Sequence, residues 1–330
     1  MDTIDILKKG MLISAVAFLV ACGGGSSSSS GGPTYNGKTE PAKITADNAD
    51  SLLSASIDGA SAASQSASVS SESSAEQTKA RLPGIAARLK KLSQSASKKL
   101  DSQGSVTAII TPVNETNPGN CGGEEIVSGS YNDETFEISM NIQYNSYCDT
   151  EETDGSTMTG GISVTGTFDI DAGYFEFNMS FRSLTSVDET DSLTLNGTIA
   201  MSGTDTTFNV SMTFDFSDNN ANKVYRVENY KIAIEEFGIY PSGHYTASIS
   251  GKVYHPDFGS YTIATLQPVY VNFADDYPYA GVIKISGDNS SVTATFLSGG
   301  KYKLEIDEDG DDIADVIKSC DSKTDTCEII

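Results

Sequence analysis

The sequence contains no tryptophan and only two histidines, His244 and His255. The two histidines fall near the ends of one predicted strand, an odd number of positions apart, so we expect them far apart on opposite faces. This excludes a zinc centre built on both of them. The chain also lacks a nucleophile elbow, a zinc-protease helix, a phosphate loop and a dinucleotide fingerprint. Carboxylates are plentiful, but nothing singles out a glycosidase-type pair. We therefore predict that the protein is not an enzyme.

Basic residues are also scarce, because 21 Lys and Arg stand against 45 Asp and Glu, which gives a formal net charge of −24. A protein with this negative charge repels nucleic acid and anionic lipid, so we expect no nucleic-acid partner. The exception is the stretch 77–100, which has no acidic residue. Its basic residues are Lys79, Arg81, Arg88, Lys90, Lys91, Lys98 and Lys99.

No apolar run reaches the length of about 20 residues that a membrane-spanning helix needs. The run from Met11 to Ala21 follows Lys8 and Lys9 and leads into Leu19-Val20-Ala21-Cys22. A basic start, a hydrophobic middle and small residues before a cut are the layout of a secretory signal. The last four residues resemble the lipobox of bacterial lipoproteins and match its pattern at all four positions.

The resemblance implies that residues 1–21 are a signal peptide and that Cys22, once acylated, becomes the amino terminus. The lipid bilayer is then a partner, and two or three acyl chains hold firmly because each buried methylene contributes about 0.8 kcal/mol. Asp after the cysteine resembles an inner-membrane retention signal in Gram-negative lipoproteins. Gly23 stands there instead. We therefore expect a lipid anchor in the outer membrane, with the body on its periplasmic face or at the cell surface.

Two segments precede the main domain. Residues 22–44 are rich in Gly and Ser and predict a flexible tether after the acylated cysteine. Residues 45–103 predict a helical segment, with Thr45 as a cap and Ala49, Leu52, Leu53 and Ile57 at helical spacing. The order of residues 54–78, which are Ser/Ala-rich, is left open by the sequence.

A second helix is predicted after Pro83, with apolar residues at three- and four-residue steps. These are Ile85, Leu89, Leu92, Ala96 and Leu100. Its basic face has two interpretations: it lies on anionic lipid or cell-wall polymer, or it packs on the acidic body of the same chain. We favour the second interpretation, because opposite charge is available within the chain.

Residues 104–330 have a period of two, typical of half-buried strands. The alternation is clearest in 136–144, 175–181 and 208–216. Further strand candidates are 162–170, 193–201, 224–234, 245–254, 261–265, 269–273, 282–286, 292–297 and 302–306. We therefore predict a mostly β fold of about a dozen strands in a large antiparallel sheet, either a sandwich or a curved half-barrel. It follows a short helical segment and a disordered tether.

Acylation of Cys22 leaves four cysteines, Cys121, Cys148, Cys320 and Cys327. An exported protein meets an oxidising compartment, so four thiols indicate two disulfides. Of the three connectivities, we favour Cys121–Cys148 and Cys320–Cys327, because each pair flanks an apparent local hairpin. A four-cysteine metal site is disfavoured by the lack of a Cys-x-x-Cys pair.

The stretch Asp307-Glu308-Asp309-Gly310-Asp311-Asp312-Ile313-Ala314-Asp315 resembles the calcium loops of thrombospondin-type repeats. The resemblance implies Ca²⁺ ligands at Asp307, Asp309, Asp311 and Asp315, because oxygens at these positions converge on a hard cation. Asp312 and Lys318 depart from the family pattern. The alternative is a hairpin turn between strands 302–306 and 313–317. No cofactor is required for the predicted fold.

Three functional hypotheses follow. The first is an outer-membrane lipoprotein with a non-enzymatic binding or structural role, in which a curved sheet holds a hydrophobic ligand against its apolar face. The second is a structural or interaction lipoprotein with a fully packed core and an envelope protein as partner. The third is an acylated transmembrane β-barrel, which ten-residue strands with one apolar face would suit. The sequence does not define an oligomeric state.

Overall fold

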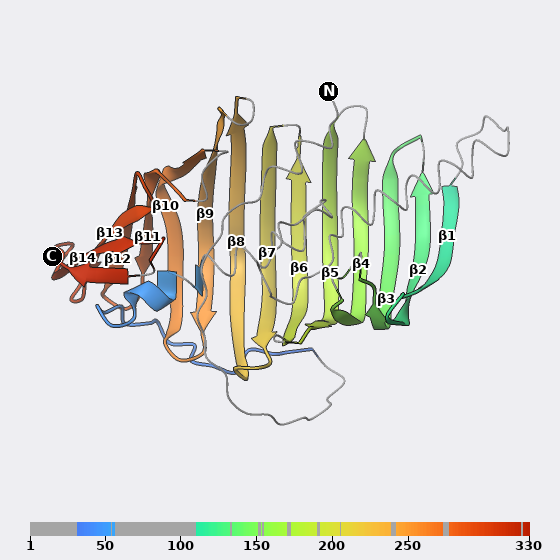
Figure 1. Cartoon of the computed structure of the whole chain (residues 1–330), viewed down its shortest axis with the longest axis horizontal. Helices are drawn as coiled ribbons and strands as arrows, with labels where there is room; N and C mark the ends of the chain where they lie inside the picture. Colours follow the sequence, from blue (N-terminus) through green and yellow to red (C-terminus); the bar gives the residue numbers. More distant parts are fainter. Residues whose placement is uncertain are drawn as a thin grey trace.

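The computed structural model describes residues 32–56 and 110–330, except 54, 133, 151–152, 154, 170–172, 190–191, 205, 239–241, 273–276 and 325. Its dominant element is one antiparallel sheet of fifteen strands that neighbour each other in chain order (Figure 1). The strands are β1 (Ile110–Pro118), β2 (Gly122–Asn132), β3 (Glu137–Cys148), β4 (Thr157–Asp169), β5 (Tyr174–Val187), β6 (Ser192–Gly203), β7 (Thr207–Asp218), β8 (Lys223–Phe237), β9 (His244–His255), β10 (Gly259–Asn272), β11 (Ala280–Ser286), β12 (Ser291–Leu297), β13 (Lys301–Asp307), β14 (Val316–Asp321) and β15 (Thr326–Ile329).

The predicted mostly β fold is confirmed, and the alternating sequence pattern explains it. In β3, Ile138, Met140 and Ile142 are buried, whereas the residues that alternate with them, beginning with Glu137, are exposed. The same alternation holds in β5 and β7. Alternate side chains of a strand point to opposite faces, so each of these strands presents one apolar face and one polar face.

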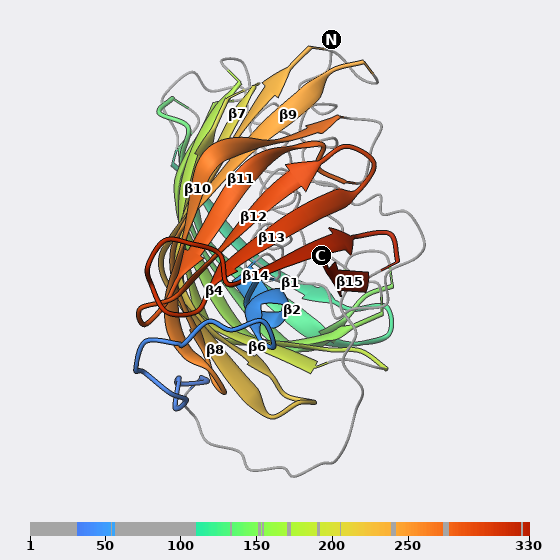
Figure 2. The ribbon, with the colours of Figure 1, turned by 90° about the vertical axis from the view of Figure 1, so that its left-hand side faces the viewer.

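The sheet is strongly curved and open (Figure 2). Strands β1 and β15 form its two ends, and among the described strands no pairing joins them. A short helix, residues 49–56, lies on the concave side (Figure 2). It contacts Tyr230 and Tyr261, which belong to the apolar side of the sheet. The apolar face is therefore the concave face, and the polar face is convex.

The helix follows the predicted pattern. Thr45 accepts a hydrogen bond from the backbone N–H of Ala49, and the side chain of Asn48 accepts one from the N–H of Thr45. Ala49 and Leu52 are fully buried, and Leu53 is nearly so. The remainder of the predicted helical segment, including the basic helix after Pro83, lies outside the described residues. Among the residues described, no helix is long and apolar enough to cross a membrane.

The predicted tether, 22–44, is wrong at its carboxyl end. Residues 32–44, which we name the strap, pack on the sheet, where Tyr35, Ala42 and Ile44 are buried. The strap also pairs with β10, because Ala42 donates to the carbonyl of Ser260 at 2.7 Å and Ser260 donates to the carbonyl of Glu40 at 2.8 Å. Gly/Ser-rich composition concealed these few apolar anchors, whose partners in the sheet are 180 or more positions away.

Three strand predictions also need correction. The strand candidates do not include β1, β2 or β15. The separate candidates 261–265 and 269–273 form one strand, β10, which is interrupted by register shifts between Thr265 and Gln267 and between Gln267 and Tyr270. The strand expected at 313–317 begins later, at Val316, because the preceding residues belong to the Asp-rich turn.

Candidate functional site

The concave face carries an unbroken apolar surface. One cross-strand row runs from β3 to β8. Its members are Met140, Val164, Met179, Ile199, Met212 and Tyr230, each at most 2% exposed. Cross-strand neighbours of this kind are the unit of packing in a sheet. The face is therefore a packed apolar surface many strands wide.

Methionine is concentrated on this face. Every methionine of the described residues lies there and is at most 3% exposed. These are Met140, Met158, Met179, Met201 and Met212. Methionine has three rotatable bonds and a polarizable sulfur, so a methionine-rich surface adapts to apolar groups of different shapes.

The helix 49–56 is fastened to this face by two tyrosine hydroxyls. Tyr230 on β8 donates to the carbonyl of Ser56 at 2.7 Å, and Tyr261 on β10 donates to the carbonyl of Leu52 at 3.0 Å. Burial raises the pKa of the Tyr230 phenol well above its ordinary value, with the Tyr261 hydroxyl a lesser cause. The Tyr230 hydroxyl therefore stays protonated and acts as a donor across the physiological range. The two hydrogen bonds fix the helix over β8–β10.

The convex face holds the start of the strap. Asp215 on β7 accepts two hydrogen bonds from the Arg226 guanidinium, at 2.7 and 3.0 Å, and a third from the backbone N–H of Tyr35 at 3.0 Å. The hydrogen bond to Asp215 raises the pKa of Arg226 above its ordinary value, although burial opposes it. Burial raises the pKa of Tyr35 to about 12. The cluster is a neutralised, ordered clamp on the strap.

Sequence reasoning missed this clamp. Arg226 is one of the few basic residues of the acidic β domain, which was the available signal. Its pairing with Asp215 follows from strand register, and its contact with Tyr35 joins residues far apart in the chain. Neither relationship has a local sequence pattern.

The two histidines occupy different surroundings. His244 stacks on Phe237 and lies beside Tyr270. His255 is buried between Tyr225 and Phe258. Burial lowers the pKa of His255 to about 4, with the nearby Asp257 charge opposing and Lys223 assisting the shift.

The Asp-rich turn gathers part of the predicted ligand set. Oxygens of Asp307, Asp309 and Asp315 lie within 4.8 Å of one another. Asp311 is not in that group, and its carboxylate accepts the backbone N–H of Ile313. The turn closes the β13–β14 hairpin, as the second interpretation predicts, and it brings three of the four predicted carboxylates together.

Asp307 is buried and organises the turn. Its two carboxylate oxygens accept the backbone N–H groups of Gly310 at 2.6 Å and Asp312 at 3.1 Å. Burial raises the pKa of Asp307, but these backbone hydrogen bonds outweigh that effect, and the net shift is downward. The turn also holds the segment that follows the strap, because Glu308 accepts the backbone N–H of Ala46.

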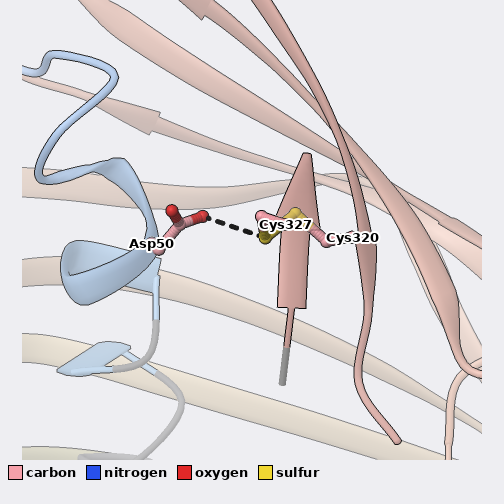
Figure 3. A group of neighbouring side chains, drawn as sticks. All are labelled: Asp50, Cys320 and Cys327. Carbon is pink, nitrogen blue, oxygen red and sulfur yellow. Dashed lines mark hydrogen bonds between the residues drawn. A yellow bond between two sulfur atoms is a disulfide. The ribbon is translucent and has the colours of Figure 1, made fainter. Parts of the chain in front are cut away.

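Both predicted disulfides are present. Cys121–Cys148 joins the β1–β2 turn to the end of β3, and Cys320–Cys327 joins directly paired residues of β14 and β15. Asp50 of the helix lies beside the second disulfide, with a carboxylate oxygen 3.6 Å from the Cys327 sulfur (Figure 3). A disulfide sulfur carries no proton, so this is a contact and not a donated hydrogen bond. Lys318 holds the other Asp50 oxygen at 2.6 Å.

Cys22 and the rest of the lipobox lie outside the described residues. Comparison with known proteins adds no further constraint, because no family model, curated protein or solved structure matches the chain.

Proposed function

We propose that the protein is an outer-membrane-anchored lipoprotein with a non-enzymatic role at the cell envelope, and that its curved sheet holds a hydrophobic ligand. The lipobox pattern at Leu19–Cys22 supports the anchor. The two disulfides agree with an oxidising compartment outside the cytoplasm.

The observation that carries the ligand proposal is the apolar concave face. This face is rich in methionine. The described helix packs on one part of the face, over β8–β10. The sheet is also open, because among the described strands no pairing joins β1 to β15. A ligand with an acyl chain or another elongated apolar group fits this chemistry.

A second candidate function rests on a specific observation as well. Met140, Met179 and Ile199 are at most 2% exposed, as expected of a packed core. In that case the protein is a structural or interaction lipoprotein, and its partner is an envelope protein that contacts its loops. In the first candidate function, contacts with a ligand replace part of the packing on the concave face. In the second, that packing stays as it is.

Native mass spectrometry separates the two. The chain from Gly23, exported to the periplasm and purified without detergent, is expected to retain a lipid-sized mass. A Met179→Gln variant on the concave face is expected to lose that mass, whereas Asn178→Gln, its convex neighbour on β5, keeps it. A bare mass for the unaltered chain would instead establish the packed-core alternative.

We also propose a structural Ca²⁺ at the Asp-rich turn. Asp307, Asp309 and Asp315 would hold it, because clustered carboxylate oxygens are the ligands that Ca²⁺ prefers. The ion would brace the β13–β14 hairpin, whose turn holds Ala46, just after the strap, through Glu308. It has no catalytic part in this proposal.

A further inference from the structure

The concave face over β2–β5 is buried, although no described helix covers it. One row of paired residues crosses these strands and is at most 1% exposed: Val127, Ile142, Ile162 and Phe181. The helix 49–56 lies over β8–β10, and strands β11–β15 lie at the opposite end of the sheet (Figure 1). Apolar side chains on one face of a sheet stay in water unless a second layer packs on them. This part of the face therefore requires a layer that the described residues do not supply.

That layer meets a buried charge. Glu125 on β2 alternates with Val127 on the concave side and is fully buried. The side-chain amide of Asn117 on β1 donates to the Glu125 carboxylate at 3.1 Å, and Tyr144 on β3 is its paired neighbour. Removing a carboxylate from water is costly unless the group is hydrogen-bonded and paired with a cation. The layer over β2 is therefore expected to bring a basic side chain to Glu125.

The course of the chain indicates which residues form this layer. Ser56, in the described helix, is fully buried, and its carbonyl accepts the Tyr230 hydroxyl of β8. The next described residue is Ile110, which begins β1 at the edge of the sheet. The stretch 57–109 therefore connects the concave side of β8 to β1, and β2–β7 lie between these two strands. This stretch contains residues 85–100, which we name the basic segment.

The basic segment has a suitable length and pattern. Its apolar residues recur at helical spacing, and a helix of its sixteen residues would be about 24 Å long. At the usual strand spacing, β2 and β6 are about 19 Å apart. In such a helix Lys99, three positions after Ala96, borders the apolar stripe, whereas Lys98 lies on the opposite side. Lys99 is also at the end of the segment that leads to β1, the neighbour of β2.

We propose that the basic segment packs its apolar stripe on the concave face of β2–β6 and that Lys99 pairs with the buried Glu125. The partner of this face is then a part of the same chain. Opposite charge supports the pairing, because the β domain is acidic and the basic segment has no acidic residue. The inference goes beyond the proposed function. A hydrophobic ligand would lie between the segment and the sheet, whereas a packed core would use the segment as its second layer.

Photo-cross-linking of the full chain tests the docking. The photoreactive residue benzoylphenylalanine replaces Leu92 in the apolar stripe or, as the matched control, Gln94 on the opposite side of the predicted helix. Mass spectrometry then maps the linked peptides. We expect position 92 to link to concave residues of β3–β6 such as Met140 and Met179, with severalfold lower yield from position 94.

Three results would overturn the docking: no link from position 92 to the concave face of β3–β6, links to the convex face, or equal yields from both positions. A mixture of isotopically light and heavy chains shows whether a link joins two copies. Links from position 92 that join only different copies would make a second copy the occupant of this face, and would also overturn the proposal.

Two charge reversals test the pairing with Glu125. Lys99→Glu and its control Lys98→Glu change the net charge equally at neighbouring positions. Only Lys99→Glu is expected to lower the cross-linking yield from position 92, by severalfold, because it places two carboxylates together in a buried site. Adding Glu125→Lys should restore the yield, and Glu125→Gln, which keeps the shape of the side chain, should restore part of it. Equal effects of the two reversals, or no restoration by either Glu125 variant, would overturn the pairing.

Discussion

Asp215 and Arg226 face each other across β7 and β8 in a two-pronged ion pair, with oxygen–nitrogen distances of 2.7 and 3.0 Å. The same carboxylate accepts the backbone N–H of Tyr35. The Asp215 carboxylate therefore takes part both in the pairing of β7 with β8 and in the attachment of the strap. The Asp215 side chain is 12% exposed and that of Arg226 is 30% exposed, so solvent screens the pair only in part.

Replacing Asp215 by Asn tests this shared role. The variant keeps the shape but removes the charge that holds the guanidinium, and we expect a loss of about 1–2 kcal/mol in the free energy of unfolding. Urea denaturation measures it. Trypsin should also cut sooner after Lys38 in the strap. The matched control is Glu235→Gln on the exposed side of β8, with a change within about 0.5 kcal/mol. Equal stability of both variants would contradict the clamp.

The stability of the protein should depend on His255 in mild acid. Because burial lowers the folded-state pKa of His255 from 6.5 to about 4, the neutral ring favours the folded state. Its contribution is complete above pH 6.5 and declines as the pH falls from 6.5 toward 4, where the unfolded chain binds a proton first. The loss is at most about 3 kcal/mol.

Urea denaturation of His255→Phe at pH 7 and pH 5 checks this dependence. The variant should lose less stability over that interval than the unaltered protein. The folded-state pKa of Asp307 is also lowered, so protonation of Asp307 destabilises the protein in acid. That loss occurs only as the pH falls below the ordinary pKa of 3.8, which is outside the interval. The same slope in both proteins would show that His255 is not the responsible group.

The two disulfides should contribute unequally. Cys121 and Cys148 are 27 positions apart, and Cys320 and Cys327 are 7 apart. A cross-link stabilises mainly by restricting the unfolded chain, so removal is expected to cost about 3.5 kcal/mol for the longer loop and about 2.4 for the shorter one. Paired Cys→Ala variants compared by urea denaturation give both values. A larger loss for the short loop would mean that contacts around Cys320, which is buried, outweigh chain entropy.

Calcium should stabilise the Asp-rich turn. Titration calorimetry is expected to show one Ca²⁺ bound, with a higher melting temperature in calcium than in chelator. Asp309→Asn should weaken binding, because it removes one of the three clustered carboxylates. Asp288→Asn, in the β11–β12 turn, is the matched control. If no heat of binding and no shift in melting temperature were observed, the turn would close the hairpin without binding calcium.

The features that the sequence predicts are local ones. Ile138, Met140 and Ile142 alternate with polar residues, and that period of two requires a strand with one buried face. Each favoured cysteine pair also spans a short stretch of chain, so the predicted connectivity needed only the hairpins to form.

What the sequence did not predict depends on distant partners. β1 contains Pro112 and β2 contains Gly122, Gly123 and Gly129, which interrupt the strand pattern. Tyr35 looks like an isolated aromatic residue in a polar segment, and only the register of β7–β9 supplies its partners. The curvature of the sheet likewise depends on all fifteen strands together.

The most direct test of the account is the mass of the intact protein extracted from the outer membrane. The account predicts a chain that begins at Cys22, carries two or three acyl groups, and lacks the hydrogens lost in forming both disulfides. A chain that retains residues 1–21, or a cleaved chain with an unmodified Cys22, would contradict the lipid anchor and with it the proposed function.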